Sequence, residues 1–198
     1  MRTREKSSLT LIKSITSLIR IVPKPIKRKI TDSYLSEIQI YVSEIHVEGI
    51  TRTRHKLFKW LERRPQTMMM LTFSSNEPSP EVIHLYSELI KRFNNPIGLH
   101  VHISNVVYSP PLLPSYSTQL KRIRDGLLHL CSMGKTTKDF ASGHWNYNTD
   151  TFLVCSELAL TNVHVHVKEI PKITSTCGIP KGIKLIPVMG YLHDYNLT

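Results

Sequence analysis

The chain has 198 residues, of which 40% are hydrophobic, so it is long enough to bury one substantial core and short for two. No run of 18 apolar residues predicts a membrane span. The cysteines Cys131, Cys155 and Cys177 are widely spaced and odd in number, which argues against a disulfide framework and favours a reducing compartment. We therefore expect a cytoplasmic location, either free or peripheral at a membrane.

The formal net charge of +11 is concentrated at the N-terminus. Residues 1–30 hold nine Lys and Arg against one acid, which leaves only +3 for the rest of the chain. We expect residues 1–36 to form a basic amphipathic arm and residues 37–198 to form the domain. The arm could cover part of the domain, bind an anionic membrane surface through residues 1–30, or serve as a removable targeting peptide. No motif for specific nucleic-acid recognition accompanies its charge.

Beyond the arm, apolar runs alternate between strand and helix periodicity. Expected strands are 38–48, 68–73, 97–103, 139–143, 162–167 and 182–189, and expected helices are 55–64, 80–93, 119–131 and 148–160. This alternation requires crossover connections and therefore a mostly parallel sheet. The sequence predicts an α/β fold whose sheet is closed or partly closed into a distorted (β/α)7-type barrel, since eight units typically need about 250 residues.

Imidazole and carboxylate side chains recur two residues apart near strand ends. The pattern comprises His46-Val-Glu48, His100-Val-His102, His164-Val-His166 and Tyr191-Leu-His193. Side chains two residues apart in a strand lie on one face, so each pair points to the same side. A shared site at one rim of the sheet would explain the recurrence.

Two imidazoles and one carboxylate with an open fourth position are a common catalytic zinc arrangement. Glu48, His100 and His102 supply this minimum set, and zinc is the metal we expect. The other histidine pair, His164 and His166, is better explained as hydrogen-bonded residues of the core or rim, with a role behind or in place of the ligands left open.

The order of the motifs along the chain gives a second indication of function. The chain reads Glu44-Ile-His-Val-Glu-Gly49, Met69-Met-Leu-Thr-Phe73, Ile97-Gly-Leu-His-Val-His102, Asp139-Phe-Ala-Ser-Gly-His-Trp-Asn-Tyr-Asn148 and Tyr191-Leu-His-Asp194. Over residues 40–198 this resembles a divergent member of the polysaccharide deacetylase (NodB-homology) family. The resemblance implies a distorted (β/α)7 barrel with one divalent metal, usually zinc, that removes acetyl groups from sugars.

Position by position, the resemblance makes Glu48 the ligand carboxylate and His100 the first histidine ligand. The family's second histidine lies four residues on, where this chain has Ser104. His102 would have to take its place as the third metal ligand.

The catalytic positions also depart from the family's pattern. His46 occupies the position of the base aspartate, and Asp139 that of the arginine that orients it; His193 matches the catalytic acid. A histidine base held by an aspartate would still provide a proton acceptor with a charge partner. Trp145 and Tyr147 match residues that line the substrate.

The sequence therefore predicts a metal-dependent hydrolase, acting on C–N bonds of an acetylated carbohydrate or a related amide. An amidohydrolase-like metal barrel also uses an H-x-H strand, but on the first strand and not the third. The other alternative is a catalytically decayed barrel that serves as a carbohydrate- or membrane-surface-binding module.

Overall fold

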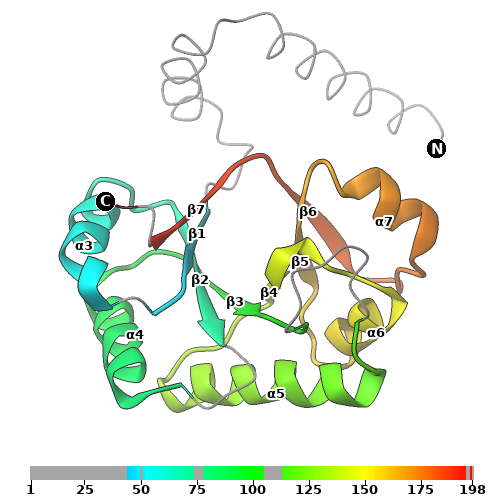
Figure 1. Ribbon diagram of the computed structural model, residues 1–198, viewed down its shortest axis with the longest axis horizontal. Helices are drawn as coiled ribbons and strands as arrows, with labels where there is room; N and C mark the ends of the chain where they lie inside the picture. The colour runs from blue at the N-terminus through cyan, green and yellow to red at the C-terminus, as the bar shows by residue number, and fades with distance from the viewer. Residues whose placement is uncertain (1–43, 50, 74–77, 105–112, 195–196, 198) are drawn as a thin grey trace, which may run out of the picture. The chain divides into compact units, whose positions relative to one another are not determined.

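The computed structural model describes residues 44–49, 51–73, 78–104, 113–194 and 197, so the arm expected at residues 1–36 lies outside the described part. The described strands form one parallel sheet in the order β6-β5-β4-β3-β2-β1-β7. They are β1 (Glu44–Val47), β2 (Met68–Phe73), β3 (Ile97–Val101), β4 (Asp139–Ser142), β5 (Asn162–His166), β6 (Lys184–Val188) and β7 (Tyr191–His193). The sheet curls into a half-barrel with helices between the strands, which confirms the predicted fold (Figure 1).

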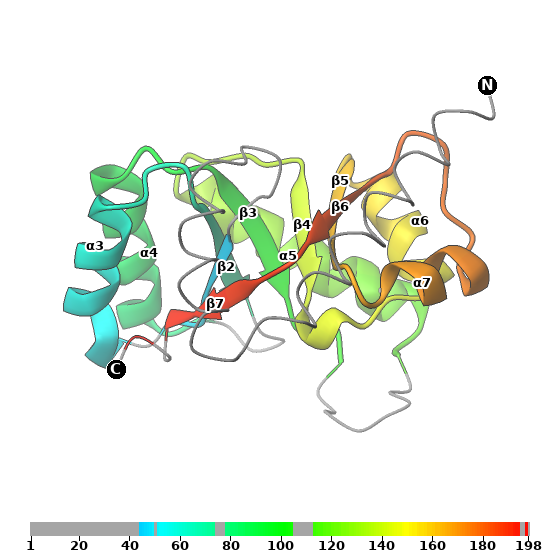
Figure 2. The ribbon, with the colours of Figure 1, turned by 90° about the horizontal axis from the view of Figure 1, so that it is seen from above.

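The curl follows from the connection between the two edge strands. Only Met189 and Gly190 separate the end of β6 from the start of β7, although these strands lie at opposite edges of the sheet. Since consecutive Cα atoms are about 3.8 Å apart, the two strand ends lie within about 11 Å of each other. Figure 2 shows β6 and β7 running nearly end to end across the open side of the sheet.

The helices lie around the outside of the curled sheet, with α3 next to α4 and α6 next to α7 in both views (Figures 1 and 2). They are η1 (Thr51–Thr53), α3 (Arg54–Glu62), α4 (Pro80–Arg92), α5 (Tyr116–Ser132), η2 (Gly143–Trp145), α6 (Thr149–Glu157) and α7 (Ile170–Thr176). Two of them begin at capping residues: the Ser79 hydroxyl accepts from the backbone of Val82, and Asn148 forms a reciprocal capping box with Thr151.

The two faces of the sheet differ in chemistry. The outward face is apolar and packs against the helices. Its buried residues include Ile45, Val47, Met69, Leu71, Phe73, Leu99, Val101, Phe140, Val163 and Val165. The inward face alternates with it and carries the histidines and carboxylates, because every second side chain of a strand points to the same side. The sheet thus buries its apolar face and gathers polar groups inside the curl.

The element boundaries differ modestly from those expected. The described part of the first strand begins at Glu44, and the third strand ends at Val101 instead of residue 103. Helix α7 was missed because its Pro and its run of Thr and Ser are weak helix signals, although Pro171 is favourable in a first turn. In the described part of the chain, no helix has the length and apolar character needed to span a membrane.

Candidate metal centre

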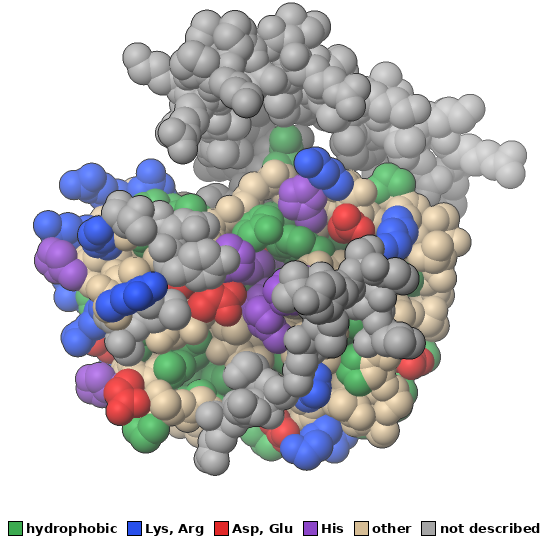
Figure 3. All heavy atoms as spheres, in the orientation of Figure 1, with side chains coloured by type: hydrophobic (Ala, Val, Ile, Leu, Met, Phe, Trp, Pro, Cys, Tyr) green, Lys and Arg blue, Asp and Glu red, His purple; other side chains and the backbone are tan. Residues whose placement is uncertain are grey.

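Two groups of polar side chains lie on the inward face. The mouth cluster consists of Glu48, His100, His102 and His193, near the C-terminal ends of β1, β3 and β7. The floor cluster consists of Glu44, His46, Asp139 and His164, which are joined by hydrogen bonds. Figure 3 shows histidine side chains beside an acidic side chain near the centre of the face turned toward the viewer.

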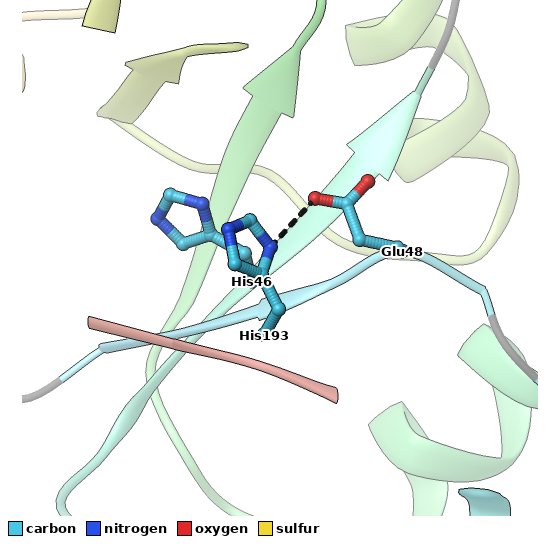
Figure 4. A group of neighbouring side chains, drawn as sticks. All are labelled: His46, Glu48 and His193. Carbon is cyan, nitrogen blue, oxygen red and sulfur yellow. Dashed lines mark hydrogen bonds and ion pairs between the residues drawn. The ribbon is translucent and has the colours of Figure 1, made fainter. Parts of the chain in front are cut away.

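The mouth cluster is arranged around the Glu48 carboxylate. Its Oε1 lies 3.1 Å from Nδ1 of His193 and 3.8 Å from Nε2 of His100, and its Oε2 lies 3.5 Å from Nε2 of His102. One donor atom each from Glu48, His100 and His102 lies within 4.8 Å of the other two, and the same holds for Glu48, His46 and His193. Figure 4 shows the second group, with the His193 ring beside the carboxylate.

Several buried polar atoms at the mouth lack hydrogen bonds. Among the described residues, no hydrogen-bond partner is in place for Nδ1 of His100, Nε2 of His102 or Oγ1 of Thr72. Thr72 and His100 face each other across β2 and β3, so these atoms belong to one region. Buried polar groups are otherwise nearly always paired, and such a concentration of unpaired atoms points to a place where a ligand binds.

The backbone around the mouth is held by contacts from the helices and from β4. The Tyr86 hydroxyl lies 2.7 and 2.8 Å from the carbonyl oxygens of Val47 and Thr72, which fixes the ends of β1 and β2 together. A Cβ added at Gly143 would lie 2.8 Å from Cγ of His102, so only glycine permits this close approach.

The protonation of the mouth cluster suits a cation. Burial raises the pKa of the Glu48 carboxyl, but the neighbouring His102 and His193 imidazoles outweigh burial and hold that pKa well below its ordinary value. Burial and the nearby His46 lower the pKa of His100 well below its ordinary value. Glu48 is therefore ionised and His100 neutral, which are the forms that bind metal ions.

The floor cluster is a continuous chain of hydrogen bonds. Nε2 of His46 lies 2.8 Å from Oε1 of Glu44, and Oε2 of Glu44 lies 2.9 Å from Nδ1 of His164. Nε2 of His164 lies 3.0 Å from Oδ1 of Asp139, which also accepts from the Asn162 amide at 3.1 Å. Glu44 and His164 are on strands separated by three others, so they meet across the curl.

Opposed effects set the charges of the floor cluster. Burial lowers the pKa of His164, but hydrogen bonds with Asp139 and Glu44 outweigh it and raise that pKa to about 9. Burial raises the pKa of the Glu44 carboxyl, and the hydrogen bonds from His164 and His46 bring it below its ordinary value. Asp139 behaves in the same way, with His164 and Asn162 as partners. The cluster thus holds an imidazolium between two carboxylates.

A strained turn brings an aromatic side chain over the inward face. His144 and Trp145 follow β4 with φ of 56° and 54°, a left-handed conformation that non-glycine residues rarely adopt and that often marks functional sites. The Trp145 ring lies 5.4 Å from that of His46 and 5.0 Å from that of Tyr191, centroid to centroid. The His144 ring lies 5.0 Å from that of His102.

The structure thus brings together most of the residues that the sequence pointed to. The metal-ligand candidates Glu48, His100 and His102 converge. His193 bonds Glu48, and His46 lies between the two clusters with its ring 4.2 Å from that of His100.

Two predicted residues have other neighbours than expected. Asp139 bonds His164 and not His46, whose carboxylate partner is Glu44, because the curl of the sheet brings Glu44 and His164 together across the interior. The Tyr147 hydroxyl accepts from the backbone of Ser142 and donates to the carbonyl of His164, so it joins β4 to β5 instead of facing the mouth.

Sequence reasoning gave no role to two residues of this region. Glu44 continues the two-residue series of His46 and Glu48 by one step toward the N-terminus, and this signal was available. Tyr191 lies two residues before His193, so the same alternation places it on the inward face, where it stays 39% exposed with its ring 5.0 Å from that of His46.

Comparisons with known proteins find likeness in structure alone. No protein-family model matches the chain, and no curated protein sequence matches it. The 4-alpha-glucanotransferase from Thermococcus litoralis is similar with a TM-score of 0.47 and 16% identity, over 66% of this chain, which spans only 23% of that protein. The deacetylase domain of BpsB from Bordetella bronchiseptica is similar with a TM-score of 0.50 and 10% identity, over 75% of this chain and 70% of that domain. The chain has a deacetylase-like fold.

Proposed function

We propose that this protein is a metal-dependent hydrolase that removes an acetyl group from a carbohydrate or a related amide. The observation that carries the proposal is the convergence of Glu48, His100 and His102 at the C-terminal ends of parallel strands, where the buried Nε2 of His102 has no hydrogen bond among the described residues. The deacetylase-like fold supports the same reaction class.

The residues present fit a divalent cation such as zinc. Ligand atoms around tetrahedral zinc lie about 3.3 Å apart, given bonds of about 2.0 Å. Oε2 of Glu48 lies 3.5 Å from Nε2 of His102, Oε1 lies 3.8 Å from Nε2 of His100, and one donor atom of each residue lies within 4.8 Å of the other two. Two neutral imidazoles and one carboxylate leave a fourth position for chemistry. A zinc ion held there would supply Lewis-acid polarisation of the acetyl carbonyl and a more acidic water.

Two histidines near the metal ligands serve as the general base and the general acid. Because Nε2 of His46 is engaged by Glu44, Nδ1 is the atom with which His46 accepts a proton as general base. His193, anchored through Nδ1 on Glu48, protonates the departing nitrogen or oxygen. Asp139 contributes through His164, since it has no hydrogen bond to His46 among the described residues.

We propose that the substrate stacks on the aromatic side chains beside His46. Trp145 is half-buried beside His46, and Tyr191 is exposed next to it. Flat aromatic rings next to hydrogen-bonding groups suit the apolar faces of a sugar ring. Tyr147 has no part in this surface.

Metal analysis of the purified full-length chain tests the proposal. We expect about one equivalent of zinc after incubation and gel filtration. His102→Ala should lose the metal, whereas His55→Ala, which changes an exposed histidine on α3, should retain it. Binding of less than about a tenth of an equivalent by the wild type would remove the metal site.

Acetate release from acetylated amino-sugar oligomers then tests the reaction class. The zinc-loaded protein should release acetate, and His46→Gln should lower kcat by about 100-fold or more as expected for loss of a general base. A zinc-loaded wild type without activity toward acetylated sugars or amides would favour a binding module instead.

A further inference from the structure

We infer that His164 is a positioning residue, an imidazolium clamped between Glu44 and Asp139 that keeps Glu44 ionised and thereby fixes the tautomer of His46. The inference depends on the proposed function only for the role of His46 as a base. The protonation states themselves follow from the floor cluster and need neither metal nor substrate.

Hydrogen-bond accounting requires two donors on His164. Each of its ring nitrogens lies 2.9 or 3.0 Å from a carboxylate oxygen, and an ionised carboxylate can only accept. A neutral imidazole has one N–H, so its other nitrogen would face Glu44 or Asp139 lone pair to lone pair. The ring satisfies both contacts only when both nitrogens are protonated.

Protonation of a carboxyl group would be the other way to satisfy these contacts, and the neighbouring donors argue against it. Glu44 already receives His46 on Oε1 and His164 on Oε2. Asp139 receives His164 and the Asn162 amide on the same oxygen. A proton on Oδ1 of Asp139 would reverse the bond to His164 and leave that oxygen a poorer acceptor for the Asn162 amide, so the ionised carboxylate suits these donors better.

Among the described residues, Glu44 and Asp139 form no ion pair with a lysine or arginine. In the described part of the chain, the ion pairs of Glu44 and Asp139 are all with histidines. The charged and titratable groups that face His164 come from β1 and β4, and the Tyr147 hydroxyl binds its backbone carbonyl. The raised pKa of His164, about 9, agrees with the charge that the geometry requires.

The consequence for His46 is a single available nitrogen. With Glu44 ionised, Nε2 of His46 must carry the hydrogen that it donates to Oε1, so in the neutral form of the ring the lone pair is on Nδ1. The tilted ring of His100 and the stacked ring of Tyr191 lie against His46 and restrict its rotation. If His164 lost its charge, Glu44 could take up a proton, donate to Nε2 and reverse the tautomer.

The same hydrogen bonds hold His164 in place but do not allow it to relay protons. A ring with hydrogens on both nitrogens has no lone pair with which to accept a proton from Glu44. Protons released at His46 are therefore not passed on through His164.

Nitrogen-15 NMR of histidine-labelled, metal-free full-length chain tests the inference. At pH 7.5 we expect one buried imidazolium assigned to His164, with both nitrogens protonated, and a hydrogen on Nε2 of His46. Wild-type spectra that show His164 as a neutral ring would overturn the inference, and no variant has to fold for that result.

Matched variants test the coupling. His164→Gln keeps a hydrogen-bonding side chain without the charge and should shift His46 toward the Nδ1–H tautomer, as should Glu44→Gln. His166→Gln, two residues along the same strand and without a bond to Glu44, should leave His46 unchanged. An unaltered His46 tautomer in folded His164→Gln would refute the positioning role, while zinc binding by the same protein would leave the proposed function standing.

Discussion

The floor and mouth clusters share one face of one sheet but differ in how completely their polar atoms are paired. At the floor, every ring nitrogen of His164 and both oxygens of Glu44 have partners at 2.8–3.0 Å. At the mouth, Glu48 lies 3.5 Å or more from His100 and His102, and one nitrogen of each ring has no hydrogen bond among the described residues.

The polar groups of the floor cluster bond one another and stabilise the fold, whereas those of the mouth cluster remain able to bind a ligand. A satisfied buried network stabilises one arrangement of the interior, and removal of one member leaves an uncompensated charge. An unsatisfied network gains its missing interactions when a cation binds. Stability should therefore depend on the floor, and metal affinity on the mouth.

The largest expected effect comes from a matched pair of substitutions on β1 and its continuation. Glu44→Gln leaves the buried His164 imidazolium with one carboxylate and should lower the free energy of unfolding by about 3–5 kcal/mol. Glu48→Gln changes a carboxylate that is 15% exposed and is bonded to the partly exposed His193, so although its pKa is also lowered it should cost less than Glu44→Gln in the absence of metal. Urea denaturation with chelator present measures both, and equal losses would contradict the distinction.

The pH dependence of stability should follow His164. Its pKa is raised from 6.5 to about 9 in the folded state, so its contribution is complete below about pH 6.5 and is lost as the pH rises through 9. At 1.36 kcal/mol per pH unit this interval amounts to about 3 kcal/mol. Denaturation midpoints between pH 6 and 10 test it, and His164→Gln should flatten the decline.

At the acid end the two carboxylates act in the opposite direction. The pKa values of Glu44 and Asp139 are lowered in the folded state, so their contribution is present above their ordinary pKa values and is lost as the pH falls below them. Burial also lowers the pKa of His100, so its contribution is lost as the pH falls below about 6.5, and the metal-free protein should be most stable near pH 6.5. A maximum above pH 8 would contradict the assigned charges.

Zinc should stabilise the folded state through the mouth cluster alone. At free zinc one hundred times the Kd, the gain is about 2.7 kcal/mol for a ligand that binds only the folded protein. Thermal shift in zinc titrations should show this gain in the wild type and in His55→Ala, and lose it in His100→Ala. A gain retained by His100→Ala would place the metal elsewhere.

The sequence was sufficient to predict which residues share a face but not which ones touch. Alternation with period two and parallel pairing place His46, Glu48, His100, His102 and His193 inside the curl. Those are local properties, so the common face of these five residues could be anticipated from the motifs.

Contacts across the interior were beyond that reasoning. The strand register places His164 level with His100, because both residues pair with Ala141 of β4. His164 nevertheless bonds Glu44, which lies nearer the N-terminal ends of the strands and on the opposite side of the curl. Strand tilt and curl decide such pairs, and neither is encoded in the spacing of single motifs. This is why Asp139 was assigned to His46 and why Glu44 received no role.

A smaller effect should come from the backbone beside His102. Gly143→Ala adds a methyl group that would lie 2.8 Å from Cγ and 2.9 Å from Cα of His102, so the ring or the turn must shift. We expect zinc affinity to fall about 10- to 100-fold while the floor cluster persists. Gly190→Ala, which meets no atom within 4 Å, is the control for calorimetric titration. Unchanged affinity in Gly143→Ala would mean that the position of His102 does not set metal binding.

The smallest expected effect separates two histidines of β5. His166 is half-buried, and its Nδ1 accepts a hydrogen bond from the backbone of Lys168, so His166→Gln should change the free energy of unfolding by less than about 0.5 kcal/mol. His164→Gln on the same strand removes a charge that two buried carboxylates share, and it should approach the loss in Glu44→Gln. Because the substitution and the strand are the same, a comparable loss in the two variants would show that pairing at the floor does not determine stability.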